Sequence, residues 1–179
     1  MLTNSRAVLI VTDIQGKLAE SMYERDNLYR NLIIMIEGAK ALGLPILCVE
    51  QYPEGLGPTV PEIASHLEGY DCIAKKSFSS LRTPTFERRF AGLGRDQVIM
   101  TGIETHVCIH QTSIDFIARD IETHVVADAV SSRTAFNKSI GLDKIARAGG
   151  IITSAETALF EMLGVAEGGT FKKISKLVK

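Results

Sequence analysis

The sequence predicts an α/β fold: an open, doubly wound parallel sheet of about six strands with helices on both faces, in a Rossmann-like three-layer arrangement. Short apolar runs rich in β-branched residues alternate along the chain with longer segments of helical periodicity. The runs are nearly continuous rather than alternating, which is typical of strands covered on both faces. Because strand and helix follow each other repeatedly, and crossovers between such units are right-handed, we expect the strands to be parallel.

Six apolar runs are the predicted strands. Val and Ile supply most of their apolar residues, and these are side chains that suit a buried strand. The third run is the weakest candidate because it is short and begins with an aspartate. In chain order the predicted strands are residues 7–12, 45–49, 71–74, 97–101, 123–127 and 150–153.

Helical periodicity fills the segments between these runs. Residues 28–41 carry apolar side chains at helical spacing, with Asp26 or Asn27 as the predicted start and Gly43 as the predicted end. Residues 51–61 contain several prolines and glycines and form the one long predicted loop, which at this length is typical of a functional segment. The remaining predicted helices are residues 85–93, 107–119, 137–148 and 154–163, followed by an amphipathic tail at 170–179.

Composition predicts a single globular domain over residues 1–179 and excludes several classes of protein. Hydrophobic residues make up 45% and charged residues 23%, values that are wrong for a disordered chain. The net charge of −1 argues against a protein that coats nucleic acid or a membrane surface. Three cysteines are too few for a disulfide framework, and we expect neither a leader peptide nor a membrane-spanning run of about 20 apolar residues. We therefore expect a cytoplasmic protein without nucleic-acid or membrane partners.

Candidate functional residues follow the predicted strands, because ligands of open α/β sheets bind beyond the carboxyl ends of the strands. Asp13 ends the first run. It is interpreted either as a helix cap or as a general base in a partly desolvated environment. Lys75 and Lys76 follow the third run. They are interpreted either as solvent-exposed side chains at the edge of the sheet or as cations, one of which points into the crevice. The loop at residues 51–58 is expected to shape the pocket, with Gln51 and Tyr52 as hydrogen-bonding candidates.

Cys108 comes after the fourth strand and is followed by a helix. A thiol near a helix N-terminus is favoured as a thiolate, and the free N–H groups there can receive an oxyanion. The plainer interpretation is a small apolar residue that packs well. Cys48 and Cys72 are interpreted only in that plainer way, as packing residues.

Metal and cofactor motifs are missing from the sequence. His106 and His110 have the spacing of two metal ligands on one helix face, but no HExxH pattern and no third ligand accompanies them. Neither a GxGxxG turn nor a P-loop follows the first strand. We expect no metal and no cofactor.

Several motifs, in order, resemble the isochorismatase-like cysteine hydrolases, and the resemblance covers nearly the whole chain. Residues 50–59 are similar to the subgroup of isochorismatase domain-containing proteins. The motifs are Val11-Thr12-Asp13-Ile14-Gln15, Lys75-Lys76-Ser77-Phe78-Ser79, and residues 102–112 and 126–133.

The resemblance implies a catalytic triad of Asp13, Lys75 and Cys108. Lys75 is preferred to Lys76 because the lysine of the family stands three residues before an aromatic residue, here Phe78. The resemblance also implies a cis peptide bond at Ile103-Glu104 and an oxyanion hole formed by the backbone N–H groups of Glu104 and Cys108. The implied substrate-binding residues are Gln15, Gln51, Tyr52 and Phe78.

The implied activity is hydrolysis of a small amide-like or related acyl substrate, at carbon–nitrogen bonds other than peptide bonds, through a covalent thioester. The metal-binding histidines of nicotinamidases are absent from Glu50-Gln51-Tyr52-Pro53, and the retained Cys108 disfavours isochorismate itself as the substrate. The resemblance further implies a homo-oligomer. The alternative is a catalytically silent interaction or scaffold protein that has kept the fold.

Overall fold

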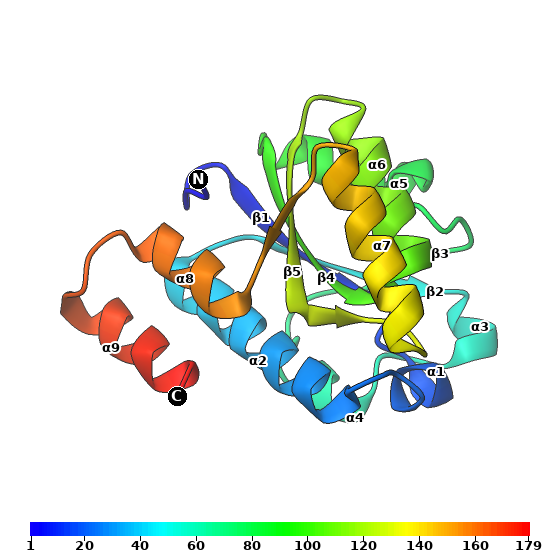
Figure 1. Cartoon of the computed structure of the whole chain (residues 1–179), viewed down its shortest axis with the longest axis horizontal. Helices are drawn as coiled ribbons and strands as arrows, with labels where there is room; N and C mark the ends of the chain where they lie inside the picture. The colour runs from blue at the N-terminus through cyan, green and yellow to red at the C-terminus, as the bar shows by residue number, and fades with distance from the viewer.

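The computed structural model describes residues 1–179, and its centre is a six-stranded sheet in the order β3-β2-β1-β4-β5-β6 (Figure 1). All neighbouring strands are parallel, so the predicted open, doubly wound sheet is confirmed. The strands are β1 (Ala7–Thr12), β2 (Ile46–Gln51), β3 (Ile73–Lys75), β4 (Gln97–Ile103), β5 (Glu122–Ser131) and β6 (Ile151–Thr153).

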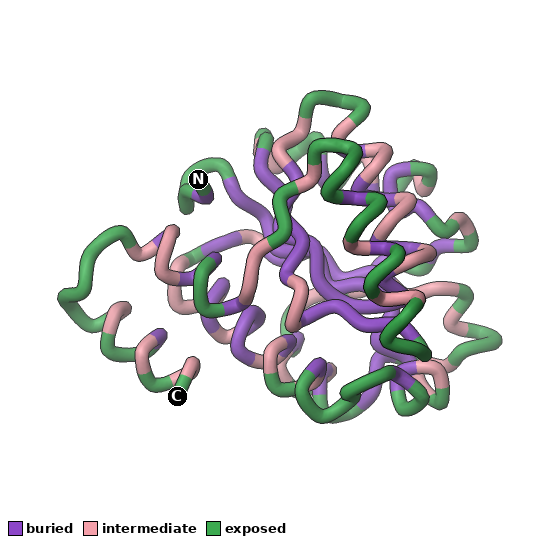
Figure 2. Tube along the Cα trace, viewed as in Figure 1, coloured by how far each residue is buried: buried purple, intermediate pink, exposed green.

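Alternate side chains of each central strand enter two separate cores. In β1, Val8 and Ile10 belong to one cluster, whereas Leu9 and Val11 belong to the other. Every residue of this strand is buried, as Figure 2 shows for the middle of the sheet. Burial on both sides explains why the strand sequences are continuously apolar.

Three helices cover each face of the sheet (Figure 1). Helices α2 (Arg25–Leu42), α8 (Ala155–Leu163) and α9 (Gly168–Leu177) supply apolar residues to the cluster that contains Leu9. Helices α5 (Pro84–Gly92), α6 (His110–Ile117) and α7 (Ala135–Arg147) supply Phe86, Phe116 and Ile145 to the other cluster. The sheet with its two helical layers is the predicted three-layer arrangement.

Helix boundaries differ from the predictions in a few places. α2 begins at Arg25, after Glu24 in a left-handed conformation, rather than at Asp26 or Asn27, and its last residue, Leu42, is followed by Gly43 as the predicted C-cap. Short helices fill segments that lack a clear period in the sequence: α1 (Gly16–Glu20), α3 (Pro53–Leu56) and α4 (Pro61–Ala64). The last two occupy or adjoin the predicted loop, where proline at the first helical position starts a turn without needing an amphipathic pattern.

The strand order places a topological switch point between β1 and β4. From β1 the chain moves to β2 on one side, and it later returns to β4 on the other side. Connections that leave in opposite directions open a crevice beyond the carboxyl ends of these two strands. Asp13 follows β1 and Cys108 follows β4, so both lie at this crevice.

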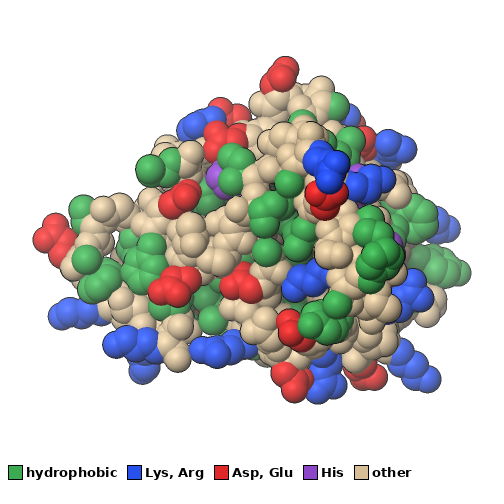
Figure 3. Space-filling model, in the orientation of Figure 1, with side chains coloured by type: hydrophobic (Ala, Val, Ile, Leu, Met, Phe, Trp, Pro, Cys, Tyr) green, Lys and Arg blue, Asp and Glu red, His purple; other side chains and the backbone are tan.

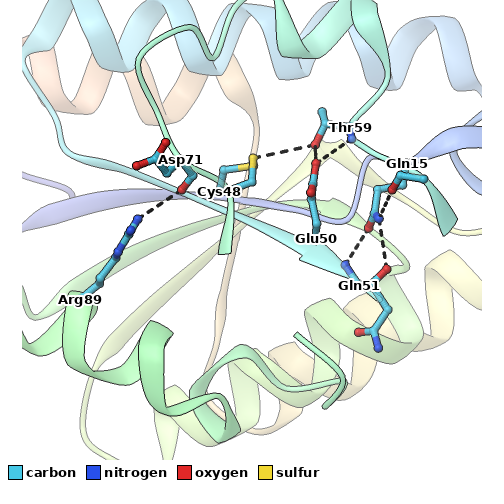
Figure 4. The surroundings of a disulfide bond; sticks show 9 residues. Gln15, Cys48, Glu50, Gln51, Thr59, Asp71 and Arg89 are labelled. Atoms are coloured by element: carbon cyan, nitrogen blue, oxygen red, sulfur yellow. Dashed lines mark hydrogen bonds between the residues drawn. A yellow bond between two sulfur atoms is a disulfide. The ribbon is translucent and has the colours of Figure 1, made fainter. Parts of the chain in front are cut away.

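Cys48 and Cys72 form a disulfide bond, so the prediction that they are unpaired packing residues is wrong. Cys48 lies in β2, Cys72 directly precedes β3, and their Cα atoms are 4.5 Å apart (Figure 4). The parallel register pairs Val49 with Ile73, so the residues before them face each other. Because β3 is the weakest strand in the sequence, this register could not be predicted.

Replacing Cys72 with Ser is expected to lower the free energy of unfolding of the oxidised protein by about 3 kcal/mol. The bond joins residues 24 positions apart, and a cross-link of this length restricts the unfolded chain by about that amount. Urea unfolding with and without dithiothreitol measures the effect. Reductant should bring the wild type, and a Cys108→Ser control, to the stability of the variant. A wild type that is insensitive to reductant would contradict the assignment.

None of the helices combines the length and the hydropathy needed to cross a lipid bilayer.

Candidate active site

Three predicted residues from different strand ends meet at the crevice. Lys75 Nζ lies 2.8 Å from Asp13 Oδ2, and the side chains of the two residues are 0% and 2% exposed. The Cys108 thiol is also buried and lies near enough to both for each to affect its pKa. The structure thus brings together the acid, the cation and the thiol that the sequence analysis selected.

The backbone turns sharply at Asp13. Its N–H still donates to Val49 O in the neighbouring strand, and its φ of 56° lies in the left-handed region. Burial raises the pKa of the Asp13 carboxyl group, although Lys75 acts in the opposite direction. Asp13 Oδ2 accepts from Lys75, whereas the buried Oδ1 has no hydrogen-bond partner. An unpaired buried oxygen is a strong acceptor, and Oδ1 is therefore available for a proton.

Four oxygen acceptors surround the Lys75 nitrogen. It donates to Asp13 Oδ2 at 2.8 Å and to Gln51 Oε1 at 2.7 Å. The carbonyl oxygens of Ser77 and Phe78 lie at 3.4 and 3.3 Å. A group with only acceptors around it must supply every proton, which an ammonium with three donors does. Lys75 is thus placed as a hydrogen-bond donor to these oxygens.

Cys108 lies within a π-helical turn, Thr105–Ile109, that leads into α6. Burial and then the negative charge of Asp13 raise the pKa of the Cys108 thiol to about 12, and Lys75 lowers it. Burial and the Asp13 charge thus oppose the stabilisation of a thiolate that the helix N-terminus was expected to provide. A thiol with a raised pKa favours its neutral form in the free site.

The end of β4 and the turn that leads from it to Cys108 are tightly packed. Gly102 has a φ of 110°, and a Cβ atom there would lie 2.1 Å from Thr12 O, so no other residue fits this position. The peptide bond between Ile103 and Glu104 is cis, as the resemblance implied. The buried Glu104 carboxylate accepts from the backbone N–H and from Nε of Arg133, at 3.2 and 3.1 Å.

No role was predicted for Arg133 from the sequence. It is 29 residues from Glu104, and no local pattern predicts that the two side chains pair. The only signal is indirect, because Arg133 ends the last of the motifs that carry the resemblance.

The four residues predicted to bind substrate lie in two different environments. Gln15 is completely buried, and Gln51 is half-buried, with its carboxamide bonded to Lys75 and to Lys76 O. Tyr52 and Phe78 are 48% and 52% exposed. A cavity of 320 Å³ lies next to the site and is lined by residues that include Tyr52 and Lys75.

The two histidines near Cys108 have other neighbours. His106 Nδ1 lies 3.0 Å from Ser132 Oγ, and burial lowers the pKa of His110. No group of three or more His, Cys, Asp or Glu side chains has the geometry to hold a metal ion.

Comparison with known proteins identifies one family. The sequence matches the family described as Isochorismatase domain over residues 7–157. Isochorismatase domain-containing protein 1 of Salmo salar is 41% identical over 146 residues. The aligned residues are 81% of this chain and 51% of that protein, so the chain spans about half the length of this relative. The secreted isochorismatase effector Isc1 of Phytophthora sojae is 38% identical over 97% of this chain and 84% of its own length. The structure of MAR1 ribonuclease from Caenorhabditis elegans is 33% identical, with a TM-score of 0.92 over 99% of this chain and 91% of that one.

Proposed function

We propose that this chain, which belongs to the isochorismatase family of hydrolases, cleaves a small amide-like or related acyl substrate with Cys108 as the nucleophile. One observation carries the proposal: a buried Asp13–Lys75 ion pair lies against the buried thiol of Cys108 at the switch point of the sheet. Two charged groups are costly to bury, and a site that does so next to a nucleophile is typical of catalysis.

Asp13 is the general base in the proposed mechanism. The neutral thiol transfers its proton to Asp13 Oδ1, the carboxylate oxygen without a partner, as the sulfur attacks the carbonyl carbon of the substrate. The raised pKa of Asp13 suits this transfer, because it makes the carboxylate a stronger base than an exposed aspartate. Lys75, held as an ammonium, compensates the negative charge that moves from carboxylate to sulfur.

Two further steps complete the reaction. The negative oxygen of the tetrahedral intermediate accepts hydrogen bonds from the backbone N–H groups of Glu104 and Cys108. Asp13 returns its proton to the leaving amine as the carbon–nitrogen bond breaks, and a thioester remains on Cys108. Water then attacks the thioester, with Asp13 taking the proton, and releases the carboxylic acid and the free thiol.

The proposed substrate enters beside Tyr52 and Phe78. Both aromatic side chains are about half exposed, and Tyr52 lines the 320 Å³ cavity next to Lys75. Of the two, only Tyr52 lines the cavity, which Asp13 and Cys108 do not line, and exposed aromatic rings are suited to hold the apolar part of a small substrate. We propose carbon–nitrogen bonds other than peptide bonds as the target, since a folded peptide chain does not reach a thiol that is 6% exposed.

A screen of small amides, carbamates and esters tests the proposal. We expect at least one substrate to be hydrolysed by the wild type, and Cys108→Ala to lose this activity while keeping its fold by circular dichroism. Hydrolysis that Cys108→Ala retains in full would refute the role of the thiol.

A second candidate function is cleavage of RNA, because the 33% identical structure from C. elegans is named a ribonuclease. Asp13 and Lys75 would then act as base and acid on a phosphodiester, and the thiol would not be needed. Charge gives this candidate little support, because nucleic-acid-binding surfaces are basic. Acidic and basic side chains lie side by side on the face drawn in Figure 3, and the net charge is −1. A ribonuclease activity that survives Cys108→Ala would favour this candidate over the hydrolase.

We further propose a homo-oligomer. Phe136 and Ile140, one turn apart on α7, are 72% and 38% exposed, and such apolar pairs suit a protein contact. The disulfide between Cys48 and Cys72 is typical of an oxidising compartment and counts against the cytosol.

A further inference from the structure

We infer that Gln51 is a positioning residue, itself held by Gln15, which fixes the Lys75 ammonium against Asp13. The inference rests on the proposed function, in which Lys75 compensates the charge of the reacting groups. Gln51 Oε1 accepts from Lys75 Nζ at 2.7 Å, as short as the 2.8 Å bond between Lys75 and Asp13. Two of the three protons of the ammonium are thereby directed to defined partners.

The carboxamide of Gln51 has only one favourable orientation. Its Nε2 donates to Lys76 O at 2.9 Å while its Oε1 faces Lys75. Rotating the amide by half a turn would bring its NH₂ group against the ammonium and its oxygen against the carbonyl of Lys76. Both contacts would be repulsive, so the accepting oxygen stays on Lys75.

Gln15 holds the backbone of Gln51 at a point where the sheet lacks a strand. The last paired residues of β1 and β2 are Thr12 and Val49, but β2 continues to Gln51, which pairs with Lys75 in β3. Beyond Thr12 the Gln15 side chain takes the place of the missing strand. Its Oε1 accepts from Gln51 N at 2.7 Å, and its Nε2 donates to Gln51 O at 3.1 Å (Figure 4). The same Nε2 also donates to Gly57 O.

Gln15 is completely buried, and its carboxamide bonds only to protein backbone. A chain of short contacts thus runs from Gln15 through the backbone and side chain of Gln51 to Lys75, and from Lys75 to Asp13. A displacement at either glutamine would move the ammonium relative to the carboxylate. These contacts give both glutamines a task other than binding substrate.

A neutral acceptor suits this position better than a charged one. The negative charge of Asp13 already raises the pKa of the Cys108 thiol, and Lys75 lowers it. A carboxylate in place of the Gln51 amide would add a second negative charge beside the ammonium and would weaken its effect on the thiol. The amide fixes Lys75 without this cost.

Replacing Gln51 with Met tests the inference, because Met keeps the length of the side chain and removes the acceptor. We expect kcat to fall by about 10²-fold with KM within about twofold of the wild type, since the loss is one of catalytic geometry. Alkylation of Cys108 by iodoacetamide at a fixed alkaline pH should also slow severalfold, because a loosened Lys75 lowers the thiol pKa less. Gln111→Met is the matched control, since Gln111 lies on α6 and is not hydrogen-bonded to Lys75.

Two results would overturn the inference. The first is a raised KM with unchanged kcat, which would make Gln51 a substrate-binding residue. The second is an alkylation profile identical to that of the wild type. Alkylation does not depend on turnover, so slower labelling of Gln51→Met in a protein that hydrolyses nothing would support the positioning role and refute only the hydrolase.

Discussion

Asp13→Asn is expected to make the Cys108 thiol more acidic while nearly abolishing turnover. The Asp13 carboxylate raises the pKa of the thiol through its negative charge, so a neutral amide should bring the pKa below its value of about 12. Each pKa unit is worth about a factor of ten in thiolate fraction, and alkylation of the variant at about pH 9 should be faster by at least about tenfold. Loss of the general base should lower kcat by about 10²- to 10⁴-fold.

The opposite directions of these two effects identify Asp13 as a base rather than as a structural residue. A variant that had simply lost its packing would expose the thiol but would also unfold more easily, which thermal denaturation would detect. Asp120→Asn makes the same chemical change at an exposed position and should alter neither rate. If alkylation of Asp13→Asn were slower than that of the wild type, the assigned electrostatics of the site would be wrong.

Lys75→Met is expected to destabilise the protein by about 3–5 kcal/mol. Removing one partner of a buried ion pair leaves the other charge without compensation, and Asp13 is 2% exposed. The double variant Asp13→Asn/Lys75→Met removes both charges and should recover part of this loss. Urea unfolding of the two single variants and the double variant measures the coupling between the residues.

Lys76→Met provides the control for this measurement. Lys76 is the next residue in the chain and is exposed, so its replacement should change the free energy of unfolding by no more than about 0.5 kcal/mol. Equal stabilities of Lys75→Met and Lys76→Met would contradict the buried ion pair.

The fold and the meeting of three side chains could be predicted because they depend on properties of single segments. The continuous apolar run before Asp13 and the helical period after Cys108 are local patterns, and strand ends of a parallel sheet meet at one edge. The same reasoning placed Lys75 and Lys76 at that edge even though β3 has only three residues, and the family resemblance selected Lys75.

Other features depend on tertiary register and burial, which no local pattern carries. The pairing of Cys48 with Cys72 follows from the alignment of β2 with β3. The raised pKa of the Cys108 thiol follows from burial and from the charge of Asp13, which is distant in the chain. The sequence identifies Gln51 as a polar residue at a strand end, but only the structure shows that its partner is Lys75.

The covalent step on Cys108 is the central claim, and intact-protein mass spectrometry tests it most directly. The wild type, mixed with a slowly released carbamate or ester and quenched in acid, should gain the mass of one acyl group, which peptide mapping should locate on Cys108. Cys108→Ala should gain no mass and form no product. Product formation by the wild type without any adduct, together with full activity of Cys108→Ala, would contradict the account.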